Sequence, residues 1–311
     1  IMSSDWSSDV CSSDLAFDPN GKLLRQLKRD KVLNRSYGQL SKGVRNADII
    51  IIDQPIDFLA LHYEAIGEDC KAAVIVVDTS PLPLYSAQLA EKFLPKEAAL
   101  VSMVPSFNYS ALDQLPFVRE SGSEALFQES MVAISSPSNQ FRDGEQIGAR
   151  LATAVGASVM FMDPYELQEA MVKTQFLPNY VAMAVQHALM QQPSWRDEER
   201  IASSEYFQLT RPVLGTIELE HPELPALENR ESLVRALDEV VGELTDLRDL
   251  IARGKASALN EYLQNAVQAR IAWQEKRRQN TFGNQATGAA DMPKTSDVYQ
   301  NLFLGGLGRK K

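Results

Sequence analysis

Cysteine and histidine are scarce in this sequence, which limits the metal and redox chemistry that it can support. Cys11 and Cys70 are the two cysteines in 311 residues, too few for a disulfide framework or a thiolate metal cluster. The three histidines, His62, His187 and His221, lie far apart along the chain and show no metal-ligand spacing. We therefore predict that the protein holds no metal.

Long apolar runs and excess positive charge are also missing. No run approaches the length needed to cross a bilayer, and the first residues lack the charged-then-apolar pattern of a signal peptide. The net charge of −10 argues against a nucleic-acid-binding surface. We expect a cytoplasmic protein that binds neither membranes nor nucleic acid.

A glycine-rich phosphate-binding loop is absent from the printed sequence. Residues 1–15 instead carry a Ser-Ser-Asp repeat, and residues 11–15 match what a common sequencing-adapter end encodes when it is read in frame. We predict that residues 1–15 are a non-native, disordered leader that replaces the first strand and its phosphate loop. A chain altered in this way should bind a dinucleotide poorly. The alternative is a natural, disordered Ser-rich leader.

Two β-branched runs give the strongest indication of fold. Ile49–Ile52 is the first, and residues 73–77, which lead into Asp78, are the second. Such runs, separated by a helix-length spacer, are typical of buried parallel strands in a βαβ unit. Because ligands bind beyond the carboxyl ends of such strands, a nucleotide site is predicted at four residues: Pro55, Asp78, Thr79 and Ser80. The alternative is a doubly wound domain without a cofactor.

Asp18 follows a further strand-like segment at residues 16–17, which we expect to neighbour Ile49–Ile52 in the sheet. A dinucleotide-binding fold places an acid there to hold the adenosine ribose hydroxyls. This carboxylate would repel the extra phosphate of NADP, so it favours NAD as the cofactor. An Asp before Pro-Asn is also common in turns, which is the alternative interpretation.

The remaining pattern predicts two domains. Strands at 47–52, 73–77, 98–104, 131–134 and 158–162 alternate with helices at 21–29, 57–66, 84–93 and 144–155. Residues 163–279 carry only helical periodicity, at 165–190 with a kink at Pro178, at 228–251 and at 255–277. The predicted fold is an α/β dinucleotide-binding domain (16–162), Rossmann-like with its first strand missing, followed by an all-α domain (163–279). Residues 280–311 are predicted to be a disordered tail.

The last two helices each carry a wide apolar stripe, more than one small bundle usually buries. We therefore predict a homodimer that shares a core through the helical domain, with a monomer as the alternative.

Several short motifs occur in a characteristic order. They include Asn46-Ala47-Asp48 before the isoleucine run, Asp78-Thr79-Ser80, Met162-Asp163-Pro164-Tyr165-Glu166, Phe176-Leu177-Pro178 and Phe207-Gln208-Leu209-Thr210-Arg211. In this order they resemble the prephenate/arogenate dehydrogenase family of tyrosine biosynthesis, over residues 16–277. The resemblance implies an NAD(P)-binding domain, a helical dimerisation domain and a carboxylic acid substrate clamped by Arg211. A surface role for Arg211 is the alternative.

The sequence departs from that family where its catalytic histidine belongs. The position is Val104, which cannot polarise the substrate hydroxyl during hydride loss. Two further family imidazoles are replaced by the amides Gln175 and Asn179, and the strand-end serine, Ser80, lies one position early. No residue could therefore be assigned as the catalytic acid or base.

Three functions remain open from the sequence. One is a divergent prephenate/arogenate dehydrogenase with rearranged acid–base groups. Another is an NAD-dependent dehydrogenase of a different small carboxylic acid, hydrogen-bonded by Asn108, Gln175 and Asn179. The third is a dimeric family member that has lost catalysis.

Overall fold

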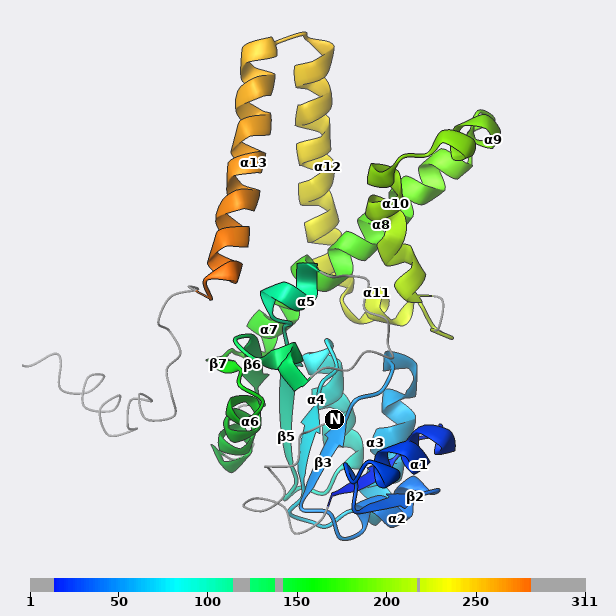
Figure 1. Cartoon of the computed structure of the whole chain (residues 1–311), viewed down its shortest axis with the longest axis vertical. Helices are drawn as coiled ribbons and strands as arrows, with labels where there is room; N and C mark the ends of the chain where they lie inside the picture. Colours follow the sequence, from blue (N-terminus) through cyan, green and yellow to red (C-terminus); the bar gives the residue numbers. More distant parts are fainter. Residues whose placement is uncertain (1–13, 114–123, 138–141, 217–218, 281–311) are drawn as a thin grey trace, which may run out of the picture.

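The computed structural model describes residues 14–113, 124–137, 142–216 and 219–280. A sheet packed between helices forms one half of the protein, and helices form the other (Figure 1). The predictions for residues 1–13 and for the tail from 281 lie outside the described residues. Within the described ranges, no strand follows residue 161, in agreement with the predicted all-α second half.

The central sheet has five strands in the order β3-β4-β5-β6-β7. Their bounds are Ile49–Ile52, Ile75–Asp78, Ala99–Pro105, Met131–Ser135 and Ser158–Phe161. All neighbouring pairs are parallel except β5 and β6, which are antiparallel. The three parallel strands β3, β4 and β5 therefore end at one edge of the sheet.

Helices cover both faces of this sheet. Val76 packs with Tyr63 of α3 (Leu59–Asp69) and Leu89 of α4 (Pro83–Phe93), whereas Val77 packs with Leu151 of α6 (Arg142–Ala154). Successive side chains of a strand point to opposite faces, so β4 contributes to two separate cores. Burial on both faces explains why its sequence is uniformly apolar.

A separate parallel pair is formed by β1 (Leu15–Phe17) and β2 (Arg35–Tyr37). We expected the strand before Asp18 to neighbour Ile49–Ile52, and this is wrong, because β1 hydrogen-bonds β2 and the described residues supply no strand that joins β1 to β3. Helices α1 (Gly21–Arg29) and α2 (Leu40–Val44) complete this unit. Leu15 lies in β1, so the prediction that residues 1–15 are disordered is wrong at Leu15.

The predicted long helix of residues 165–190 is interrupted. It consists of α7 (Pro164–Met171), a π-helical turn η3 (Val172–Phe176) and α8 (Leu177–Met190). Pro178 lacks an N–H and would clash with the preceding helical turn, so the distortion falls before the proline rather than at it. This turn displaces the register of the side chains on either side of it.

Shorter segments and a long hairpin complete the chain. The segments are η1 (Ile56–Phe58), α5 (Tyr109–Asp113), η2 (Glu124–Phe127), α9 (Trp195–Glu198), η4 (Glu199–Ile201), α10 (Ser204–Thr210), η5 (Arg211–Thr216) and α11 (Leu224–Glu228). The hairpin consists of α12 (Arg230–Ala252) and α13 (Ala256–Arg278), which project from the sheet side by side (Figure 1).

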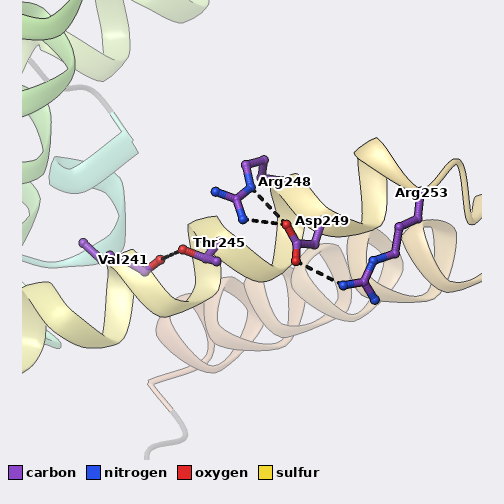
Figure 2. Close-up of polar contacts among 5 residues, drawn as sticks. All are labelled: Val241, Thr245, Arg248, Asp249 and Arg253. Atoms are coloured by element: carbon purple, nitrogen blue, oxygen red, sulfur yellow. Dashed lines mark hydrogen bonds and ion pairs between the residues drawn. The ribbon is translucent and has the colours of Figure 1, made fainter.

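The hairpin leaves a large apolar surface exposed. Its exposed aliphatic residues are Val234, Val241, Leu244, Ile251, Leu263, Val267 and Ile271. Figure 2 shows that polar contacts near the tip of α12 stay local, with Asp249 accepting from Arg248 and Arg253. Such exposed ion pairs contribute little stability. They do not cover the apolar residues.

The two halves of the protein share a buried core. Leu82, before α4, packs against Val172, Phe176 and Leu233 of the helical half. A buried pair of amides lies beside it, where Gln168 of α7 donates from Nε2 to Asn229 Oδ1 and accepts from the backbone N–H of Leu84 at 3.3 Å. Burial and satisfied polar groups together fix the helical half to the sheet.

Candidate functional site

Asp18 lies directly after β1, at the edge of a cavity. The cavity has a volume of about 380 Å³ and is lined by Phe17, Asp18, Pro19, Gly21, Leu24, Arg25, Ser36, Tyr37 and Gly38. One carboxylate oxygen, Oδ1, accepts the Asn20 amide at 2.6 Å. Asn20 in turn caps α1 by accepting from the amides of Lys22 and Leu23. The predicted turn role and a place in a cavity therefore occur together at Asp18.

This cavity lies beside helix α3. The Phe17 ring is 6.5 Å from the ring of His62, which packs edge-on against Phe58 at 6.4 Å. His62 Nδ1 also lies 2.7 Å from the Phe58 carbonyl oxygen. These contacts place the unit of β1 and β2 against the main sheet domain, although its strands are not hydrogen-bonded to β3.

Polar residues connect the ends of β3 and β4. The Thr79 hydroxyl donates to Asp53 Oδ1 at 2.9 Å, and the Thr79 amide donates to the Ile52 carbonyl oxygen at 3.1 Å. Pro55 is exposed two residues beyond Asp53. The structure thus places Pro55 and Thr79 at one sheet edge, as the sequence predicted.

Asp78 and Ser80 are buried rather than open to a ligand. Asp78 accepts the Tyr63 hydroxyl at Oδ2 and the Ser80 amide at Oδ1, both at 2.8 Å. The Ser80 hydroxyl accepts the Leu82 amide at 3.2 Å. Both side chains shape the turn into α4, and Asp78 is fully buried. Burial raises the pKa of the Asp78 carboxyl, and the two hydrogen bonds offset this only in part.

We expect Asp78 to make folding stability depend on pH. Because its folded pKa is raised, its contribution is complete below the ordinary pKa of an aspartate and is lost as pH rises through the folded value. Asp78→Asn should therefore flatten the fall of unfolding free energy with rising pH, measured by urea unfolding across a pH series. Tyr63→Phe, which removes a hydrogen bond at a cost of about 1–3 kcal/mol but keeps the carboxyl, should instead steepen that fall, because the Tyr63 hydroxyl lowers the Asp78 pKa. An unchanged slope in Asp78→Asn would contradict the assignment.

The turn after β5 follows Val104, the position at which the resemblance implies a histidine. Val104 lies in β5, and the next residues are held against β6, with the Ser106 hydroxyl donating to the Met131 carbonyl oxygen at 2.9 Å. Asn108 accepts the Ala111 amide at 2.8 Å and donates to the Ala125 carbonyl oxygen. The side-chain oxygen and nitrogen of Asn108 are thus both hydrogen-bonded to the backbone of neighbouring segments, although the sequence suggested a substrate contact.

Sequence reasoning missed the residues of α13 that contact this turn. Arg277 Nη2 donates to the Phe107 carbonyl oxygen, and Arg277 Nη1 lies 3.4 Å from the Ser106 hydroxyl. Gln274 Nε2 donates to the Tyr109 hydroxyl at 2.6 Å. The periodicity of α13 predicted only an apolar stripe. The basic residues in its last turn were the one feature of the sequence that could have indicated this contact.

The predicted substrate residues of the helical half lie on adjoining segments. Arg211 begins η5, which packs along α8, and Asn179 lies in the first turn of α8. Gln175 lies in η3 and is exposed. We further predict that Arg211 lies close to the turn at residues 104–108.

The described ranges contain neither a membrane-spanning helix nor a metal-binding cluster. None of the helices there has both the length and the apolar content to cross a membrane. No group of three or more His, Cys, Asp or Glu side chains among the described residues could hold a metal ion.

Comparison with known proteins gives a consistent set of relatives. No family model matches the chain. Cyclohexadienyl dehydrogenase of Zymomonas mobilis subsp. mobilis is 22% identical over 246 residues, which cover 75% of this chain and 78% of that protein.

Solved structures of the same kind share the fold. Prephenate dehydrogenase from A. aeolicus, in complex with hydroxyphenyl propionate and NAD+, has a TM-score of 0.70 at 17% identity, covering 84% of this chain and 88% of that one. Synechocystis arogenate dehydrogenase has a TM-score of 0.65 at 16% identity, covering 83% and 90%. The shared fold includes a Rossmann-like domain and a helical region.

Proposed function

We propose that this chain, a divergent member of the prephenate/arogenate dehydrogenase family, oxidises a cyclohexadienyl carboxylic acid with NAD as hydride acceptor. The observation that carries the proposal is the shared fold over more than four-fifths of the chain, together with the sequence relationship to a cyclohexadienyl dehydrogenase. Polar groups for the proposed site lie at the strand ends, such as the Thr79 hydroxyl, and in the turn after β5, such as the Ser106 hydroxyl.

The residues around Asp18 suit the adenosine half of a dinucleotide. The cavity offers a carboxylate, the backbone at Gly38 and the ring of Tyr37. Asp18 Oδ2 is the oxygen that we assign to the ribose hydroxyls. A bound NAD would supply the hydride acceptor. The negative charge at Asp18 supports NAD over NADP. The pyrophosphate is a separate matter, because the sequence contains no glycine-rich loop to bind it.

At the substrate end we assign Arg211 to the carboxylate. Its guanidinium can donate two parallel hydrogen bonds, which matches the geometry of a carboxylate. We infer that Gln175 and Asn179, four residues apart, contact the ring hydroxyl of the acid. Ser80 and Asn108 then shape the site through its turns, since their side chains bond within their own loops.

We also propose a homodimer through the α12–α13 hairpin. Seven aliphatic residues of the hairpin are exposed. Exposed apolar surface of this extent on a soluble enzyme domain favours a symmetric partner of the same kind.

The proposal is tested by NAD reduction in the presence of prephenate or arogenate. Because residues 1–15 are predicted to be non-native, the assay should use the protein expressed from the natural gene. Asp18→Ala should raise the KM for NAD about tenfold, because it removes a charged hydrogen-bond acceptor. Asp30→Ala, at the end of α1 and outside the cavity, is the control. Lack of reduction with both acids would reject the proposal, and an unaffected KM in Asp18→Ala would reject the assignment of Asp18.

A further inference from the structure

The last turns of α13 lie against the turn that follows β5. Arg277 reaches Phe107 across 170 residues of sequence, and Gln274 reaches Tyr109 across 165. The end of a hairpin whose tip points away from the sheet thus returns to the place where the proposed reaction occurs (Figure 1).

On its inner side the turn is held by β6 and the loop before it. Met131 exchanges hydrogen bonds with Ser106, and the backbone amide of Asn108 donates to the Leu126 carbonyl oxygen at 3.2 Å. The Phe107 ring stacks on the Phe127 ring, with 6.0 Å between the ring centroids. These contacts constrain the side chains and amides of the turn. The carbonyl of Phe107 is instead held by the Arg277 guanidinium.

Arg277 suits this role because it is partly buried and planar. Burial lowers the pKa of its guanidinium, which nevertheless remains charged. Charge-assisted hydrogen bonds are stronger than neutral ones, and a guanidinium can contact two acceptors at once. Here those acceptors are the Phe107 carbonyl oxygen and the Ser106 hydroxyl.

We propose that Arg277 is a positioning residue that fixes the turn at 105–109 from outside, so that the geometry of the site depends on the docking of α13. This inference rests on the proposed function for its catalytic consequence. Its structural part, an Arg277-dependent turn, stands on the contacts alone.

Hydrogen exchange on the full chain tests the structural part. The reporters are the backbone amides of Ser106, Asn108 and Ala111, which donate to the Met131 carbonyl oxygen, the Leu126 carbonyl oxygen and Asn108 Oδ1 respectively. Arg277→Gln should speed their exchange about tenfold, because a charged hydrogen bond is lost. Arg278→Gln is the matched control, since Arg278 is exposed and pairs with Glu275 of its own helix. Tyr109→Phe, which removes the contact with Gln274, should give a smaller increase in the same amides.

Kinetics test the catalytic part. Arg277→Gln should lower kcat for the cyclohexadienyl acid about tenfold and leave the KM for NAD unchanged, since the adenosine cavity lies on another strand end. Arg277→Lys should recover part of this loss, because an ammonium supplies the charge but not the fork. If Arg277 only stabilised the fold, Arg277→Gln would instead lower the melting temperature and speed amide hydrogen exchange throughout α13.

The outcomes separate the two proposals. Exchange in Arg277→Gln that matches Arg278→Gln at all three amides overturns the role of Arg277, even when turnover is normal. Lack of turnover in the unaltered protein rejects the proposed function, and the exchange result still decides whether Arg277 positions the turn.

Discussion

Arg211→Ala should raise the KM for the carboxylic acid substrate at least about tenfold and leave the affinity for NAD unchanged. Removal of one partner from a charged, hydrogen-bonded pair typically costs about 2–5 kcal/mol. Arg211 lies in η5, which packs on α8, and Asn179 lies on that same helix. The adenosine cavity is lined by residues of the first forty, so a change at Arg211 should not reach it.

Initial-rate kinetics with each substrate varied in turn measure this effect. Arg200→Ala is the matched control, because Arg200 is exposed in η4 of the same helical region. Arg211→Lys should recover less than half of the lost binding free energy, since a lysine cannot make the bidentate contact. An Arg211→Ala protein with an unaltered KM would mean that the carboxylate is bound elsewhere.

Phe176→Ala should destabilise the folded protein by about 3–5 kcal/mol, the usual cost of emptying a buried aromatic site. Phe176 is 5% exposed and packs in the cluster with Leu82 and Leu233, so the cavity would open between the two halves of the protein.

Urea unfolding, followed by circular dichroism, measures the loss. Phe207→Ala is the control, because that ring is 66% exposed and its removal should change stability by less than about 0.5 kcal/mol. Equal effects of the two substitutions would show that the shared core contributes little to the fold.

Local patterns in the sequence were sufficient for most of the sheet. The isoleucine run became β3, and the bounds of β4 and β5 differ from prediction by one or two residues, because strands buried on both faces are uniformly apolar. The helix at Gly21–Arg29 was predicted with its observed bounds. By contrast β2, with the sequence Arg-Ser-Tyr, carries no apolar run and was missed, since its stability comes from pairing with β1.

The site was predicted less completely, for a physical reason. Strand-end residues such as Asp18 and Thr79 were placed correctly at strand ends because parallel strands dictate where their ends lie. Burial of Asp78 and Ser80 depends on how α3 and α4 pack, which periodicity does not specify. The contact of Arg277 with Phe107 joins residues far apart in the sequence, and no local pattern records such a pair.

The buried amides Gln168 and Asn229 have a consequence for measurements across pH. An amide side chain neither gains nor loses a proton in the pH range that folded proteins tolerate. The hydrogen bond between these two residues is therefore unaffected by pH. The hydrogen bonds that join Leu84 of α4, through Gln168, to Asn229 just before α12 therefore do not depend on pH. A change of pH should therefore leave this particular contact between the two halves of the protein intact.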